Sequence, residues 1–132
     1  MDDMNDRSAA VNIGGQKYGL LLSTRAAKEI GMRYGGLGQL GEKLLTGENF
    51  EELITEFVWL ITLLANQAIL KHNLINKDNK ELLSEDAVEI LTEPADLEEY
   101  KDAILLAMYR GSKRNVESEE DIGDTGKNLT AE

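Results

Sequence analysis

The chain has 132 residues and a formal net charge of −11, with 14 Lys and Arg against 25 Asp and Glu. This charge argues against nucleic acid and against anionic membrane surfaces as direct partners, because both need a basic face. Cys is absent, which excludes a disulfide framework and a thiolate nucleophile or metal site. The acidic N-terminus is unlike a signal peptide, and the apolar run at 57–65 is far shorter than the ~20 residues that span a bilayer. The composition therefore predicts one domain of a soluble, cytoplasmic protein.

A β-hairpin is the first element that the sequence predicts, over residues 11–22. Gly14 and Gly15 suit a two-residue turn, because a positive φ costs glycine little. In that register Ile13 lies opposite Gln16, and successive side chains alternate between the two faces. A lone hairpin is only marginally stable, so its apolar face should lie on helices. The residues expected on that face are Val11, Ile13, Tyr18, Leu20 and Leu22.

The long stretch at 50–72 is predicted to be the central helix. Asn49 can cap it, and Glu52 can return the bond as a capping box. No Gly or Pro interrupts it, and its apolar residues recur at three- and four-residue steps. Its centre is apolar almost all round, so it needs cover on more than one side. The main stripe consists of Leu53, Ile54, Phe57, Leu60, Ile61, Leu64, Ala65 and Ala68.

Capping and breaking residues predict four shorter helices around the central one. Gly35 ends the first of them, and Pro94 separates the last two. Asp96 and Glu99 form a capping box for the final helix, which Gly111 closes. The four ranges are about 24–34, 37–46, 84–91 and 95–110.

Together these elements predict a mainly α (α+β) fold, in which an N-terminal β-hairpin packs on a bundle of about five helices. All of them belong to a single domain at 11–110. The N-terminus at 1–10 is polar and is expected to be disordered. The tail at 111–132 is acidic, lacks periodicity and is also expected to be disordered.

Two short motifs resemble ligand sites but lack residues that such sites need. Residues 36–41, GLGQLG, match a dinucleotide-binding fingerprint, but a helix is predicted before them where the fingerprint requires a strand. A helix–helix corner is the simpler interpretation. Residues 76–87, NKDNKELLSEDA, begin like a calcium loop, but Glu81 and Ala87 stand where such a loop needs Gly and Glu.

No residue pattern points to catalysis, a cofactor or a metal. His72, the single histidine, is expected near the end of the central helix, where the helix dipole favours a cation. The pairs Glu51/Glu52 and Glu98/Glu99 lie in the first turns of predicted helices, where the dipole favours acids. The sequence therefore predicts a protein that is not an enzyme, with no catalytic, cofactor-binding or metal-binding residues.

Four apolar residues of the central helix are candidates for binding a protein partner. Trp59 and Leu63 project away from the main stripe, and Leu70 and Leu74 lie toward the helix end. Burial of Trp59 and Leu63 under the hairpin or the last helix is one interpretation. An exposed patch that meets another protein is the other.

Three stretches, in this order, resemble the tail assembly chaperones of long-tailed phages and prophages. They are VNIGGQKYGLLLSTRAAKEI, YGGLGQLGEKLLTGENFEELI and TEFVWLITLLANQAI. In that family a G-K-x-Y-like hairpin precedes an A-x-x-E-I helix, a small L-x-x-L segment and a long helix rich in Leu and Trp. The resemblance covers residues 11–110, with one departure, because Gln16 separates the turn glycines from Lys17.

The resemblance implies a non-enzymatic protein that binds the tape-measure protein and recruits tail-tube subunits. Such chaperones act in the host cytoplasm, are absent from the mature virion and carry no catalytic residues to transfer. Many are made in a short form and a frameshifted longer form, which would diverge at the acidic tail. A homo-oligomer is also expected, because a second copy can cover a wide apolar helix.

Two other hypotheses stay open. The first is a small acidic regulatory or inhibitor protein, such as a DNA mimic or an adaptor, which would carry carboxylates in two regular rows. Many acids of this chain lie instead at predicted helix starts and in the tail. The second is a nucleotide-dependent enzyme built on GLGQLG, which would need a strand before Gly36.

Overall fold

The computed structural model describes residues 9–46 and 49–124, with side chains described as far as Ser112 apart from that of Leu45. The prediction of a mainly α fold with an N-terminal hairpin on about five helices is confirmed. Ala9 is buried and Ala10 begins a strand, so the expected disorder is wrong for these two residues, and 1–8 lie outside the described part. The elements are β1 (Ala10–Ile13), β2 (Gln16–Gly19), α2 (Thr24–Tyr34), α3 (Leu37–Thr46), α4 (Phe50–Asn76), α5 (Glu85–Leu91), the 3-10 turn η1 (Pro94–Asp96) and α6 (Leu97–Asp124).

The hairpin has the register that the glycine turn predicts. Ile13 pairs with Gln16, and both glycines between them have positive φ. Val11 and Ile13 are buried, and Leu20 continues the same buried face beyond the end of β2. Because β1 contacts α6 and β2 contacts α4, the hairpin lies across two helices that are far apart in the sequence.

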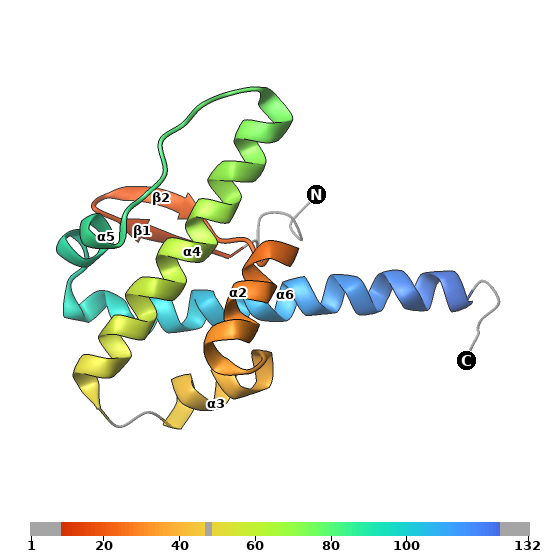
Figure 1. Cartoon of the computed structure of the whole chain (residues 1–132), viewed down its shortest axis with the longest axis horizontal. Coiled ribbons are helices and arrows are strands. Elements are labelled where there is room, and N and C mark those ends of the chain that lie inside the picture. Colours follow the sequence, from red (N-terminus) through yellow and green to blue (C-terminus); the bar gives the residue numbers. More distant parts are fainter. Residues whose placement is uncertain (1–8, 47–48, 125–132) are drawn as a thin grey trace.

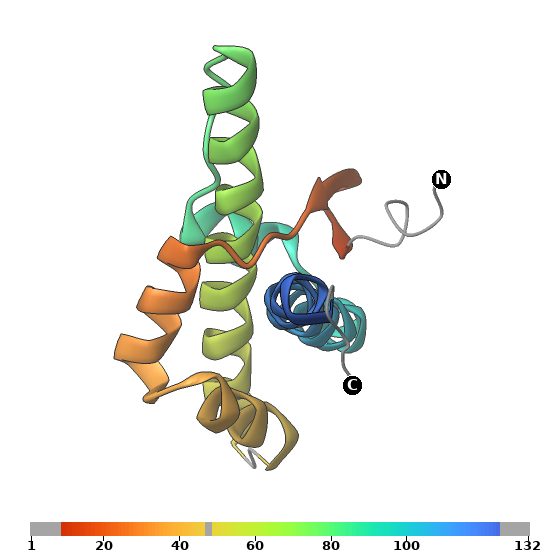
Figure 2. The ribbon, with the colours of Figure 1, turned by 90° about the vertical axis from the view of Figure 1, so that its right-hand side faces the viewer.

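α4 is the axis of the fold. Its 27 residues span roughly 40 Å. It stands between α2 on one side and the hairpin and α6 on the other (Figure 1, Figure 2). The Asn49 side chain accepts a hydrogen bond from the Glu52 N–H at 2.9 Å, which caps the first turn as expected. Leu60, Ile61 and Leu64 at its centre are fully buried.

The other helices complete one hydrophobic cluster around α4. Burying a large aliphatic or aromatic side chain contributes about 1.5–3 kcal/mol, so this cluster is the main source of stability. The large fully buried side chains that they contribute are Ile30 from α2, Leu40 from α3, Val88 from α5, and Tyr100 and Ile104 from α6.

The end of α4 and the cap before α6 differ from the predictions. α4 continues past His72 to Asn76, and Lys77 then ends it with a left-handed backbone at φ 52°. Neither Gly nor Pro marks that end, so no local stop signal predicts it. The predicted capping box from Asp96 to Glu99 is also wrong, because the Asp96 carboxylate accepts from the Glu93 N–H at 2.9 Å within η1.

The last helix does not end at Gly111. α6 runs through this residue to Asp124, so the predicted helix end is wrong, and 125–132 lie outside the described residues. Gly111 lacks the positive φ of a helix-ending glycine. A Cβ at this position would instead lie 2.8 Å from Cδ2 of Leu22. The glycine therefore allows α6 to pass close to the connection between β2 and α2.

Leu64→Asp should unfold the domain, because an unpaired charge in a fully buried position costs about 3–5 kcal/mol. Leu74→Asp is the matched control, since this residue is on the same helix but is 82% exposed. Its effect should stay within about 0.5 kcal/mol. Thermal melting followed by circular dichroism measures both. An unchanged melting temperature for Leu64→Asp would show that this side of α4 is not the core.

Gly111→Ala should destabilise the protein by about 1–3 kcal/mol, because the added methyl group collides with Leu22. Gly31→Ala in α2 is the control, because nothing lies within 4 Å of its added Cβ. That change should stabilise by about 1 kcal/mol through helix propensity. In the background of Leu22→Ala, which removes Cγ and Cδ2 but keeps the Cβ that would lie 2.9 Å from the new methyl group, Gly111→Ala should lose part of its cost. Equal stabilisation by both alanines would contradict the close approach.

Candidate functional site

The four nominated residues lie on one side of α4, but only one of them is largely exposed. At ~100° per residue, Trp59, Leu63, Leu70 and Leu74 fall within about 60° of one another around the helix. Trp59 and Leu63 are partly buried and pack against the hydrophobic core. Leu70 is also partly covered, whereas Leu74 is 82% exposed. The structure therefore does not combine them into one open apolar patch.

Trp59 packs against α2, a helix that neither interpretation named. The guanidinium of Arg33 lies over the indole, with its carbon 4.4 Å from the ring centroid. The Tyr34 ring meets the same indole edge-on, with centroids 6.1 Å apart. Such cation–π and T-shaped contacts add to simple burial. Trp59 thus acts first as a contact between two helices of its own chain.

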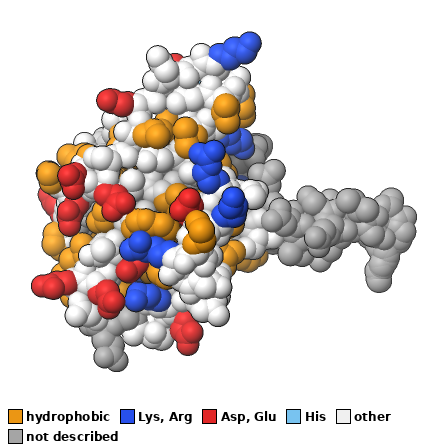
Figure 3. All heavy atoms as spheres, viewed as in Figure 1, with side chains coloured by type: hydrophobic (Ala, Val, Ile, Leu, Met, Phe, Trp, Pro, Cys, Tyr) orange, Lys and Arg blue, Asp and Glu red, His pale blue; other side chains and the backbone are white. Residues whose placement is uncertain are grey.

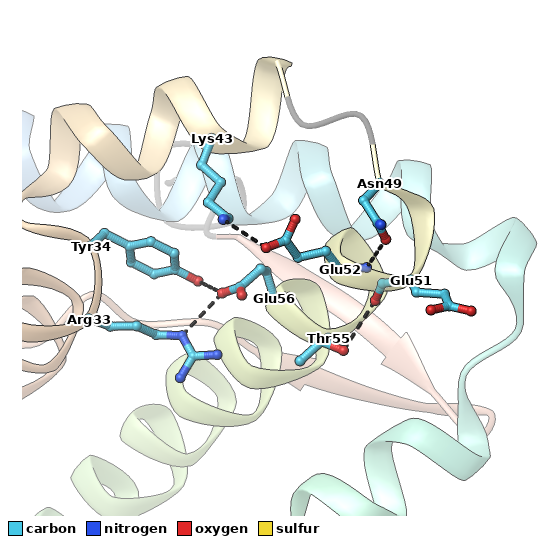
Figure 4. A network of polar contacts seen from close by, with 8 residues as sticks. All are labelled: Arg33, Tyr34, Lys43, Asn49, Glu51, Glu52, Thr55 and Glu56. Carbon is cyan, nitrogen blue, oxygen red and sulfur yellow. Dashed lines mark hydrogen bonds and ion pairs between the residues drawn. The ribbon is translucent and has the colours of Figure 1, made fainter.

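A buried carboxylate joins the same two helices. Oε1 of Glu56 accepts hydrogen bonds from the Tyr34 hydroxyl and from Nε of Arg33, the latter at 3.1 Å (Figure 4). The Glu56 side chain is only 11% exposed, whereas that of Arg33 reaches solvent. One turn earlier on α4, Glu52 pairs with Lys43 of α3 at 3.4 Å, in a more exposed position. This network ties α2 and α3 to the first half of α4.

The network sets the charge state of its members. Burial alone would raise the pKa of Glu56, but the hydrogen bonds from Tyr34 and Arg33 outweigh it, and its pKa is lowered. Burial raises the pKa of the Tyr34 hydroxyl, and its bond to the Glu56 carboxylate raises it further. Glu56 is therefore ionised and Tyr34 neutral around neutral pH. A carboxylate held in this way is a structural tie and not a general base.

Two asparagines on α4 hold the returning loop at 77–84 against the helix. The side chain of Asn73 donates to the Lys80 carbonyl at 3.1 Å and accepts from the Lys80 N–H at 3.0 Å. Asn66 makes the same pair of bonds with the backbone of Leu83, both at 2.8 Å. Seven residues apart, the asparagines share one side of the helix with Leu70. That side is therefore occupied by the chain itself along most of its length.

These asparagine contacts were not predicted from the sequence. Asn66 and Asn73 interrupt an apolar helix at a seven-residue spacing. This spacing could have marked polar partners on one helical face. The partner backbone atoms are set by the path of the loop, which no local pattern predicts.

The C-terminal end of α4 projects beyond the hairpin (Figure 1, Figure 2). It carries exposed apolar side chains. Leu74 is 82% and Ile75 is 67% exposed. His72 lies nearby, where its Nε2 contacts the Asp78 carboxylate at 2.9 Å. The hydrogen bond from His72 lowers the pKa of Asp78. The predicted place of His72 near the helix end is confirmed. Its other ring nitrogen, Nδ1, contacts the side chain of Asn76, the last residue of α4.

A trough lies between this end of α4 and the hairpin. It has a volume of about 700 Å³. The N–H of Leu21, one of its lining residues, donates to the Leu64 carbonyl at 3.1 Å, which fixes the connection after β2 against α4. We name this feature the hairpin–helix trough. Its lining residues are Ala9, Ala10, Lys17, Gly19, Leu20, Leu21, Ala68, Lys71, His72 and Ile75.

The hairpin–helix trough differs in charge from the chain as a whole. Among its described lining residues are two lysines and a histidine, and no Asp or Glu. On the face drawn in Figure 3, acidic side chains gather toward the left, and Lys and Arg lie mostly toward the middle and right. The overall charge of −11 is therefore not spread evenly over the surface.

The glycine motif at 36–41 forms the corner between α2 and α3. Gly35 caps α2 with φ 97°, and α3 begins at Leu37. The element before the motif is a helix, as predicted, so the strand that a dinucleotide site requires is missing. Among the residues that the structure describes, no group of His, Cys, Asp and Glu is arranged to hold a metal ion.

α4 is long and apolar enough to span a membrane, although its uninterrupted apolar run is short. Half of the most apolar window is buried within the described structure. The core helix of a globular domain meets the same criterion, so the length and apolarity of α4 do not decide between the two.

Comparisons of the chain with known protein families, characterised proteins and solved structures found no match.

Glu56→Gln should lower the free energy of unfolding at about pH 7 by about 1–3 kcal/mol, because Arg33 loses a charged partner. The pKa of Glu56 in the folded state lies below its ordinary value of 4.5. Its contribution is thus present above pH 4.5 and is lost as the pH falls through the lowered pKa. Urea unfolding should show that the difference in the free energy of unfolding between wild type and Glu56→Gln is smaller at about pH 3 than at about pH 7. Glu52→Gln, at a side chain that is 59% exposed, should change little. If the difference in the free energy of unfolding between wild type and Glu56→Gln does not change with pH, the charge of Glu56 does not stabilise the fold.

Proposed function

We propose that this chain is a tail assembly chaperone of a long-tailed phage or prophage. It binds the tape-measure protein and tail-tube subunits while the tail is built, acts in the host cytoplasm and performs no chemistry. The order of elements carries the proposal: a hairpin, a helix, a glycine corner, a small helix and a long apolar helix. This is the order on which the resemblance to that family rests.

The distribution of apolar surface supports the proposal. Binding a long, aggregation-prone helical protein needs accessible apolar side chains, which the projecting end of α4 offers at Leu74 and Ile75. It also needs enough charge to keep the complex in solution, and the net charge of −11 provides this. The polar network around Glu56 is used inside the fold, so no role in catalysis is assigned to it.

Co-expression with the large coiled-coil-like protein encoded just downstream tests the proposal. That protein should become soluble and co-elute with this chain in size-exclusion chromatography. Leu74→Asp should weaken co-elution, because it places a charge in the apolar surface offered to the partner. Ile90→Asp on α5 is the matched control, since Ile90 is 81% exposed, and it should have no effect.

Two results would overturn parts of the proposal. If the wild-type chain leaves the downstream protein insoluble and separate, the chaperone function is wrong. If co-elution occurs but Leu74→Asp and Ile90→Asp behave alike, the partner binds elsewhere and the end of α4 is not the surface.

A further inference from the structure

We infer that the hairpin–helix trough docks an amphipathic helix of a partner protein whose apolar stripe is bordered by Asp and Glu. This inference rests on the proposed function, because it names the partner chemistry of the surface at the end of α4.

The wall of the trough that α4 provides is built like a helix-packing face. Ala68, Lys71, His72 and Ile75 follow one another at i, i+3, i+4 and i+7. This spacing forms one continuous stripe, and ridges of such a stripe pack into the grooves of a second helix. Ile75 supplies an exposed apolar contact at the open end. An incoming helix can therefore lie along α4 for about two turns.

Small residues at the bottom of the trough permit close approach. Gly19 faces Ala68, where a Cβ added to the glycine would lie 3.9 Å from the alanine methyl group. No large side chain projects from either position. The apolar floor continues with Leu20 and Leu21 from the connection after β2. A partner with Leu or Ile along one stripe can thus bury it against this floor.

The charges of the trough select an acidic partner. Lys17 and Lys71 both line it, and neither has an ion-pair partner among the described residues. His72 is also in the lining, and its Nε2 contacts the carboxylate of Asp78, which is not a lining residue. Unpaired lysines on the two walls would face the two borders of a docked helix. Carboxylates at those borders would complement them, whereas lysines would be repelled.

A synthetic helix of about 18 residues, roughly five turns, tests the inference directly. The probe carries a Leu stripe with Glu on both borders, and the matched probe carries Lys in place of each Glu. Fluorescence anisotropy with the full chain should show saturable binding of the Glu-bordered probe. The Lys-bordered probe should bind at least about tenfold more weakly at low salt, with the difference shrinking as salt is added.

Variants locate the site. Lys71→Glu should weaken the Glu-bordered probe about tenfold, and so should Ile75→Ser through loss of apolar contact. Lys28→Glu changes the net charge equally at an exposed residue of α2 outside the trough lining, and Ile90→Ser removes an exposed isoleucine elsewhere. Both controls should bind the probe as the wild type does.

The outcomes separate this inference from the proposed function. Equal binding of both probes, or equal effects of Lys71→Glu and Lys28→Glu, would overturn the acidic helix as the occupant. If sedimentation shows a dimer that Lys71→Glu dissociates, the trough takes a second copy and the inference is wrong. Co-elution of the downstream protein that is insensitive to Lys71→Glu would leave the chaperone function standing and remove the inference. If the Glu-bordered probe binds specifically but the downstream protein does not co-elute, the inference about the trough stands and the chaperone function is wrong.

Discussion

One helix that is apolar on almost every side imposes the architecture of this protein. Water cannot be excluded from such a helix by a single neighbour, so several elements must surround it. α2 covers one side of α4, the hairpin and α6 cover another, and the returning loop closes a third. The short elements of this chain would be marginal alone. They become stable because each contributes a few side chains to the same cluster around α4.

Polar groups fix how the covering elements sit. Glu56 accepts from two residues of α2, and Asn66 and Asn73 each bind one residue of the loop backbone through paired hydrogen bonds. Hydrophobic burial has no direction, so it would tolerate sliding of one helix along another. Hydrogen bonds do not, because a displaced partner breaks them, and at the largely buried Glu56 it would also leave a charged group unsatisfied. These side chains therefore fix the positions of α2 and the loop along α4, which hydrophobic burial alone would not fix.

The same arrangement decides which apolar surface is left for a partner. Trp59 is taken up by Arg33 and Tyr34, and the loop occupies the side of α4 that Leu70 shares. In the second half of α4, what stays accessible is the end that extends past the hairpin, together with the trough beside it. The lysines there oppose the acidity of the rest of the chain. A partner with acidic borders would be steered to this end and away from the remaining surface.

Local patterns in the sequence determined the elements of this protein. The glycine pair and the alternating residues specified the hairpin register, and three- and four-residue apolar spacing specified the helices, because both signals are read within a few neighbouring residues. Only the tertiary structure shows the role of residues whose contacts are distant in the sequence. Gly111 looks like a helix stop, but it is a contact with Leu22, and Trp59 looks like a partner surface, but α2 covers it. The trough was invisible in the sequence because its walls are about 50 residues apart and join only when the hairpin folds onto α4.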